Sequence, residues 1–239
     1  MQIERKIYAP NFLTRKNLEE NLYRLILKYR KGKDKLYILD IGCGKKLYKL
    51  FWRDSDYYIG LDITSDSNAD ILGDCAYLPF KDSCFDFVVA YAVLEHVSDP
   101  ILMLKECSRV LKQNGKLIIS VPFLFPYHPT PQDHWRWTQS GIKILVESIE
   151  DLKVEEIIPC GGTISSLMFL HVWYLNLFFN KIKRRVKKQL NFLVEAGRIS
   201  SLSILNLIAY LLDNKFSKLR DPKKSNTLFL NFIVVADKR

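Results

Sequence analysis

The sequence predicts an α/β fold in which helices cover both faces of a mainly parallel sheet. Three observations carry this prediction. Short apolar segments alternate with helical patterns from residue 36 onward, these segments are too uniformly apolar to have one face in water, and the first of them ends in a glycine turn. With 239 residues, 48% of them hydrophobic, the chain can bury a core without disulfide or metal support.

The N-terminal part of the pattern predicts a leading helix and one βαβ unit. Residues 17–30 place leucines at helical spacing, and Gly32 follows as a stop signal. A buried strand over 36–42, a helix over 45–52 and a strand over 57–63 complete the unit.

The alternation continues through the middle of the chain. It predicts a strand over 85–92, a helix over 100–114 and a strand over 115–123. After an aromatic and proline-rich loop, Thr138 is a typical N-cap for a helix that runs to about Ile149. The next strand is expected over 152–160.

Residues 161–226 depart from this alternation. Residues 163–180 are largely apolar, 181–188 contain six basic residues, 201–212 are apolar again, and a last strand follows within 227–239. We therefore predict one domain over 1–239, with an N-terminal basic helical arm over 1–35. The segment 161–226 is predicted to be a helical insertion between two strands of one sheet.

The net charge of +10 is unevenly distributed. Residues 36–159 hold 18 acidic and 12 basic residues, whereas 1–35 hold 10 basic and 4 acidic ones. The excess is largest in 160–226, with 12 basic and 3 acidic residues. A surface that coats nucleic acid uniformly is disfavoured, and we do not expect nucleic acid as a partner.

The five cysteines include no CxxC pair and no histidine at zinc-finger spacing, so we expect no metal site. An odd cysteine count, an N-terminus that is charged where a signal peptide is apolar, and the absence of an 18-residue apolar run favour a cytoplasmic protein.

The glycine turn follows the first strand as Asp40-Ile41-Gly42-Cys43-Gly44. Glycines let backbone N–H groups approach a ligand, but the dinucleotide fingerprint needs a third glycine where this chain has Leu47. The Asp40 carboxylate would repel a pyrophosphate and attract a cationic, amino-acid-like ligand. Asp62 ends the second strand, at the position from which a carboxylate bonds a ribose.

Further motifs follow in order, namely GDCAYLPF around Asp74, FDFVVAYAVLEHV ending at His96 and RVLKQNGKLIISVP. With LDIGCG and GLDI, they make the sequence resemble class I S-adenosylmethionine-dependent methyltransferases of the methyltransferase type 11 group. The resemblance covers roughly residues 36–160 and the last strand. It implies a Rossmann-like, doubly wound sheet of seven strands whose last strand is antiparallel, and S-adenosyl-L-methionine as cofactor.

The resemblance also implies cofactor-binding roles. Asp40 and the turn of Gly42, Cys43 and Gly44 would hold the methionine part of the cofactor. Asp62, with the adjoining Ile63, would hold the ribose, and Asp74 with Cys75 would face the adenine. Lys46 stands where many members have a small residue, and we assign it no contact.

Methyl transfer to a hydroxyl requires a base, and histidine has a suitable pKa. His96, His128 and His134 fall in loops that follow strands on the cofactor side. The loop that contains the last two resembles the acceptor segment of glycan-modifying methyltransferases. We expect His134 or His128 to be the base, with Asp133 as orienting partner, and His96 to line the site.

These features predict O-methylation of a glycan or of a lipid-linked small molecule. Two alternatives stay open: an RNA or protein methyltransferase whose basic insertion grips a polymer, and a non-catalytic module that binds the cofactor. Residues 163–212 have two interpretations. They dock on an anionic membrane, which would place the protein peripherally on its inner face, or they form a lid or a homodimer interface.

Overall fold

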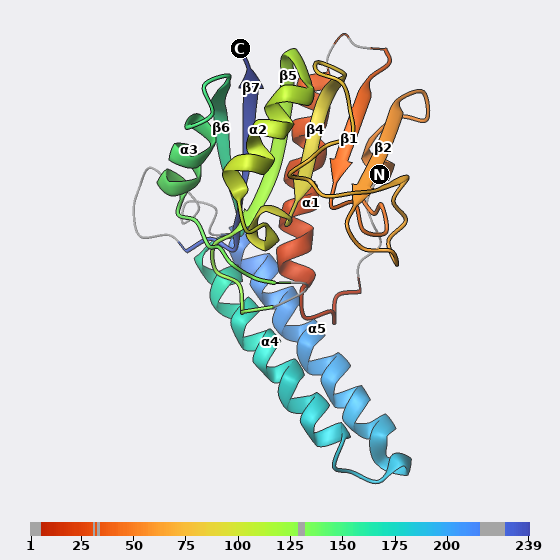
Figure 1. Cartoon of the computed structure of the whole chain (residues 1–239). Coiled ribbons are helices and arrows are strands. Elements are labelled where there is room, and N and C mark those ends of the chain that lie inside the picture. Colours follow the sequence, from red (N-terminus) through yellow and green to blue (C-terminus); the bar gives the residue numbers. More distant parts are fainter. Residues whose placement is uncertain (1–5, 31, 33, 129–131, 216–227) are drawn as a thin grey trace.

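A computed structural model of the chain describes residues 6–30, 32, 34–128, 132–215 and 228–239. One sheet of seven strands runs in the order β3-β2-β1-β4-β5-β7-β6 (Figure 1). Strand β7 is antiparallel to both of its neighbours, and the other pairs are parallel. The predicted fold class is confirmed. The strands are β1 (Tyr37–Ile41), β2 (Tyr57–Asp62), β3 (Ile71–Leu72), β4 (Phe85–Tyr91), β5 (Leu111–Pro122), β6 (Leu152–Cys160) and β7 (Asn231–Lys238).

The sheet is the middle of three layers because side chains alternate along each strand. Leu39 and Val88 face a core shared with helices α2 (Pro100–Val110) and α3 (Gln139–Glu147). The adjoining Ile38 and Phe87 face helix α1 (Phe12–Arg30) on the other side. The leading helix, predicted over 17–30, is therefore a layer of the domain.

Helices α2 and α3 each begin at a residue whose side chain caps the first turn. Asp99 accepts a hydrogen bond from the Leu102 N–H at 3.0 Å and begins α2, and Thr138 accepts one from the Gly141 N–H at 3.0 Å and begins α3. The cap predicted at Thr138 is confirmed.

Two predicted helices differ in the structure. Residues 45–52 form turns and a 3₁₀ segment, η1 (Lys49–Phe51), because Lys46 adopts a left-handed backbone with φ of 54°. Helix α2 ends at Val110, not at 114, since Leu111 pairs with Phe85 at the start of β4 and Asn114 has φ of 60°. The two-residue strand β3 has no periodicity to detect and was not predicted as an element.

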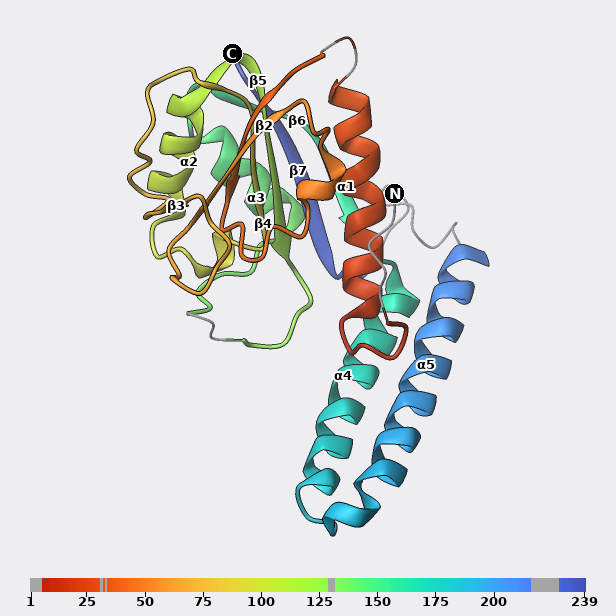
Figure 2. The ribbon, with the colours of Figure 1, turned by 90° about the vertical axis from the view of Figure 1, so that its right-hand side faces the viewer.

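The segment after β6 forms a helical hairpin of α4 (Thr163–Lys183) and α5 (Asn191–Lys215), joined by η3 (Lys188–Leu190). The two helices lie side by side and project away from the carboxyl end of the sheet (Figures 1 and 2). A small core roots the helical hairpin on α1 and β7; its buried members are Phe12, Leu13, Phe169, Ala209 and Leu230.

In the sequence the helical hairpin lies between β6 and β7, where the insertion is predicted. These two strands are neighbours in the sheet. Helix α5 begins ten residues before the predicted apolar segment 201–212. Residues 1–5 of the predicted arm and 216–226 of the predicted insertion lie outside the described residues.

Candidate active site

A cavity of about 410 Å³ lies at the carboxyl ends of β1, β4 and β5. Open α/β sheets place ligands at this edge, where the strand order reverses. The first turn of α1 closes one side of it. The residues that line it include Asn11, Thr14, Arg15, Asp40, Gly42, Cys43, Gly44, Tyr91, Glu95, His96, Ser120, Phe125, His128 and Asn231.

The turn after β1 needs glycine at two positions for different reasons. Gly42 has φ of 64°, and a Cβ on it would lie 2.4 Å from Cγ2 of Val93. Gly44 has φ of 51°, but nothing lies within 4 Å of the place of its Cβ. Gly42 thus lets the turn pack against Val93, just after β4, whereas Gly44 leaves open space at the cavity.

Asp40 ends β1 with its carboxylate buried against the cavity. The Tyr58 hydroxyl donates a hydrogen bond to it. Burial raises the pKa of Asp40 to about 7, against this hydrogen bond, which lowers it. A ligand cation would restore the ionised form, so the site fits an ammonium group.

Asp62 braces the glycine turn. Its carboxylate accepts hydrogen bonds from the N–H of Gly44 at 2.8 Å and from the N–H and hydroxyl of Thr64 at 2.9 and 2.7 Å. Burial raises the pKa of Asp62, but these donors outweigh it and the pKa is lowered. These donors fix the carboxylate at the end of β2, beside the glycine turn.

Asp62 and the other predicted cofactor residues, Ile63, Asp74 and Cys75, lie next to the cavity and are not among the residues that line it. The Gly73 N–H donates to the Asp62 carbonyl at 2.9 Å, which places Asp74 and Cys75 beside the end of β2. Asp74 is exposed, as is Ile63. The structure thus joins the strand ends of Asp40, Asp62 and Asp74 through backbone hydrogen bonds.

The thiols of the two predicted cysteines remain protonated. Burial raises the pKa of both the Cys43 and the Cys75 thiol to about 12. The Cys43 N–H already donates to the Leu61 carbonyl at 3.2 Å. Cys43 therefore shapes the turn, and its carbonyl accepts from the Lys46 N–H at 2.8 Å.

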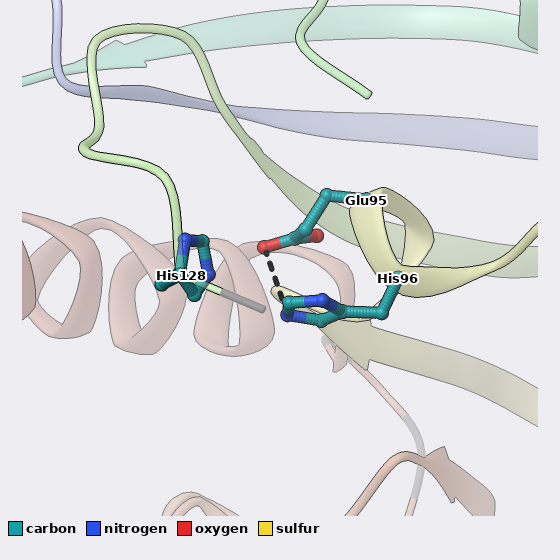
Figure 3. Close-up of side chains that lie close together, drawn as sticks. All are labelled: Glu95, His96 and His128. Atoms are coloured by element: carbon teal, nitrogen blue, oxygen red, sulfur yellow. Dashed lines mark ion pairs between the residues drawn. The ribbon is translucent and has the colours of Figure 1, made fainter. Parts of the chain in front are cut away.

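Three polar side chains meet at the far end of the cavity (Figure 3). Glu95 and His96 come from η2 (Leu94–His96), just after β4, and His128 comes from the loop after β5. Nε2 of His96 lies 4.0 Å from Oε1 of Glu95, and the two imidazole rings stand edge to face with centroids 5.0 Å apart. Burial lowers the pKa of His96 and raises that of Glu95 to about 7.

Both imidazoles are held through Nδ1. Nδ1 of His96 contacts the Gln132 carbonyl, and Nδ1 of His128 lies 3.0 Å from the Pro126 carbonyl and 3.2 Å from Oδ2 of Asp133. Arg136 donates to both oxygens of Asp133 and lowers its pKa to about 2. The Nε2 atoms of both rings are left for a ligand.

His134 lies elsewhere. Its side chain is exposed, its backbone N–H donates to the Glu95 carbonyl at 2.8 Å, and it is not among the described residues that line the cavity. The loop turns this histidine outward, so of the two predicted bases the geometry favours His128. The predicted pairing of Asp133 with a histidine is present at His128.

Three buried atoms at the cavity have no hydrogen-bond partner within the described part of the chain: the Tyr91 hydroxyl, Oε2 of Glu95 and Oδ1 of Asn231. Leaving a buried polar atom unpaired costs about 1–3 kcal/mol. Their presence in one cavity indicates that a polar ligand completes them.

A cation would find ligand atoms here as well. Glu95, His96 and His128 each offer one atom within 4.8 Å of the others. The expectation of no metal site stays a prediction, and the chelation control described below tests it.

The sequence signals for several of these residues were weak. Glu95 adjoins the predicted His96 but was not itself predicted, and Tyr91 and Asn231 look like ordinary strand residues. Arg15 enters the cavity only because α1 packs beside the turn, a tertiary contact without a local signature.

The sequence matches known proteins over the same motifs. A family model described as a methyltransferase domain matches residues 39–119. An S-adenosylmethionine-dependent methyltransferase of Mycobacterium tuberculosis, named as probable, is 30% identical over 36% of this chain and 32% of its own length. A ubiquinone biosynthesis O-methyltransferase of Rhodopseudomonas palustris is 34% identical over 36% of this chain and 39% of its own length. The chain thus spans about a third of the length of these curated relatives.

A solved structure shares the fold over most of the chain. The methyltransferase from Methanosarcina mazei, described as dependent on S-adenosylmethionine, superposes with a TM-score of 0.51 at 16% identity, over 90% of this chain and 96% of its own. At this identity the likeness concerns the fold alone. The domain match and the relatives support a class I S-adenosylmethionine-dependent methyltransferase domain of the type 11 group over residues 39–119, with S-adenosyl-L-methionine as its cofactor. The fold agrees with this assignment.

Proposed function

We propose that the protein transfers a methyl group from S-adenosylmethionine to an acceptor hydroxyl bound beside Glu95, His96 and His128. One observation carries this proposal: a single cavity connects the glycine turn and Asp40 with two imidazoles and a buried, unpaired carboxylate oxygen. Cofactor and acceptor can therefore lie in one enclosed space, which is what an in-line transfer needs.

The cofactor supplies an electrophilic methyl group on a sulfonium. The chain's own residues would hold it in three places. Asp40 would pair with the ammonium group beside the turn of Gly42 and Gly44. Asp62, with the adjoining Ile63, would hold the ribose, and Asp74 with Cys75 would border the adenine.

His128 would remove the acceptor proton through Nε2. Its Nδ1 lies near the Asp133 carboxylate, which Arg136 holds in place. This carboxylate would stabilise the imidazolium that forms when the hydroxyl proton moves to Nε2. His96, whose pKa is lowered by burial, would stay neutral and help to position the acceptor oxygen.

The acceptor we propose is a hydroxyl of a glycan or of a lipid-linked small molecule. The loop that carries His128 and Asp133 resembles acceptor segments of glycan-modifying methyltransferases, and one relative is named as an O-methyltransferase of ubiquinone biosynthesis. A polymer acceptor gains no support from the cavity, which is lined by an acidic and imidazole cluster at its far end.

The first experiment is calorimetry with S-adenosylhomocysteine on the full chain. We expect binding by the wild type, and no binding would contradict the assignment of the cavity. Transfer of labelled methyl groups to cell extract, separated into organic and aqueous fractions, then locates the acceptor. Label in RNA or protein instead would overturn the proposed acceptor class.

The base is tested by two histidine variants compared under the same conditions. We expect His128→Ala to lower kcat about 10²–10⁴-fold, since that is the usual contribution of a positioned base, with unchanged binding of S-adenosylhomocysteine. His134→Ala should leave kcat unchanged. Activity lost in EDTA and restored by a divalent cation would contradict a base mechanism and indicate a metal-bound acceptor oxygen.

A further inference from the structure

The helical hairpin carries an unusual share of exposed apolar side chains. In the described part of the chain 22 large apolar side chains are exposed, and half of them lie on this one element. Such a concentration on a soluble surface marks an interaction site. Its members are Leu167, Tyr174, Leu177, Phe178, Leu190, Phe192, Leu193, Ile204, Leu207, Ile208 and Leu211.

These side chains face away from the partner helix on both α4 and α5. Asn176 of α4 accepts from Arg198 of α5 at 3.1 Å, so both face the helix–helix contact. Tyr174 and Phe178 each lie two residues from Asn176, about 200° around the helix. On α5, Ile204 has the same spacing from the buried Leu202. The outer sides of both helices are therefore apolar.

The distal part of the helical hairpin has no core of its own. Among residues 174–201, all of which the structure describes, none is buried. This part stands free of the sheet and its covering helices (Figures 1 and 2). Within the described residues its apolar side chains stay exposed.

Six basic residues lie at the tip, within 181–188. In the described part of the chain one of these six residues forms an ion pair. It is Lys183, whose Nζ lies 3.2 Å from Oε2 of Glu195. Exposed Phe178 precedes this cluster, and exposed Phe192 and Leu193 follow it. The tip thus combines free cations with large apolar side chains.

We propose that the tip of the helical hairpin, residues 177–193, docks into the surface of an anionic phospholipid bilayer. A rigid protein partner can cover one outer side of two paired helices, whereas a bilayer surrounds an element that enters it from every side. The basic residues fit lipid phosphates, and the flanking Phe and Leu side chains fit the headgroup–acyl boundary.

Docking at the surface fits this element better than spanning. In the described part of the chain one helical stretch, Lys188–Asp213, is long and apolar enough to cross a membrane. It comprises η3 and most of α5, and 17% of its most apolar 18 residues are buried. Crossing would, however, carry the six basic residues of the tip through hydrocarbon. Their charge holds the tip at the lipid headgroups.

The root of the helical hairpin is in contact with the active site. The Phe125 ring lies 5.2 Å from that of Phe169 and 5.6 Å from that of Trp173, both on α4, and 4.8 Å from that of His128. Docking would therefore direct the cavity end of the domain toward the membrane. This consequence, which rests on the proposed function, favours a lipid-borne acceptor, while the docking itself goes beyond it.

Co-sedimentation of the full chain with vesicles tests the docking without any turnover. We expect binding to phosphatidylcholine vesicles that contain phosphatidylglycerol, and much weaker binding to phosphatidylcholine alone. Arg184→Gln/Arg185→Gln should weaken binding about tenfold or more, since each basic residue near the surface contributes severalfold. Phe192→Ser/Leu193→Ser should weaken it independently of salt.

Two matched controls remove the same chemistry elsewhere. Lys105→Gln/Lys143→Gln deletes two exposed cations, and Ile144→Ser deletes an exposed apolar side chain on α3. Both should pellet like the wild type. Equal pelleting of tip and control variants, or none by the wild type, would overturn the proposal. So would a homodimer in sedimentation velocity that Phe192→Ser/Leu193→Ser converts to monomer, because a second copy would then cover the tip.

Discussion

The burial of the Asp40 carboxylate affects which ligand the cavity binds. Its pKa of about 7 means that the empty site holds the proton at neutral pH about as often as not. An ammonium ligand binds the ionised form, so binding must release that proton below pH 7. We therefore expect binding at the proposed cofactor site to depend on pH in the physiological range.

This gives the first prediction at the scale of the residue. The affinity for S-adenosylhomocysteine should rise with pH up to about 7, by at most tenfold per pH unit, and level off above it. Asp40→Asn should abolish this rise and bind about 10–100-fold more weakly near pH 8, because a charged hydrogen-bond partner is lost. Calorimetry between about pH 5 and 8 measures both, and parallel pH curves would contradict the role of Asp40.

Some of the residues that line the cavity could be predicted from the sequence, and others could not. Asp40, Gly42, Gly44 and His96 lie at or shortly after the carboxyl ends of β1 and β4, and the ends of parallel strands meet at one edge of the sheet. Asn231 and Arg15 reach the same place from β7 and α1, far away in sequence. Their contribution depends on packing, which no local pattern encodes.

At the scale of the element, the glycine turn makes two unequal demands on its backbone. Gly42 and Gly44 both have positive φ, but only Gly42 also abuts a side chain. Gly44→Ala should cost about 1–2 kcal/mol of unfolding free energy from left-handed backbone strain. Gly42→Ala should cost clearly more, since Val93 must move. Urea unfolding at constant m-value measures this difference, and equal midpoints would contradict it.

The helical hairpin allows a second element-scale prediction. Val172 and Leu202 are buried at its root, one turn closer to the sheet than the Asn176–Arg198 contact. Replacing 174–201 by a short Gly-Ser linker should preserve the fold and S-adenosylhomocysteine binding, because no residue of that stretch is buried and Trp173, which contacts Phe125, is kept. Thermal unfolding and calorimetry check this. Loss of cofactor binding would show that the distal part supports the domain.

Prediction of elements succeeded where periodicity was long and failed where backbone geometry decided. The β6 strand was predicted with its observed bounds, and Thr138 caps its helix as expected. The helix predicted over 45–52 was wrong, because the tight turn after β1 places Lys46 in the left-handed region of backbone conformation. Charge and hydropathy alone do not show such a constraint.

At the scale of the whole molecule, two buried acids couple stability to pH. Asp40 and Glu95 both have a pKa of about 7 in the folded protein, above the ordinary value near 4. Between these values the folded state binds more protons than the unfolded state. Their contribution to stability is thus complete at low pH and is lost as pH rises toward 7.

Asp40→Asn/Glu95→Gln removes this dependence. Relative to the wild type, the unfolding free energy of the double variant should increase from about pH 5 to 8, by about 3 kcal/mol at most for each group. Denaturant titrations at several pH values test this. A difference that stays constant with pH would mean that neither acid is protonated in the folded protein.

The place of β7 between β5 and β6 has a consequence for how the chain reaches its fold. When residues 1–215 have left the ribosome, β5 and β6 are separated by an empty strand position, and each presents an open edge of unpaired N–H and C=O groups. The apolar helical hairpin is complete at that moment, before residues 231–238 arrive to close the sheet. The nascent protein would thus expose the apolar helical hairpin while its sheet is still open. Early contact with a membrane or a chaperone would protect the helical hairpin and the open strand edges at once.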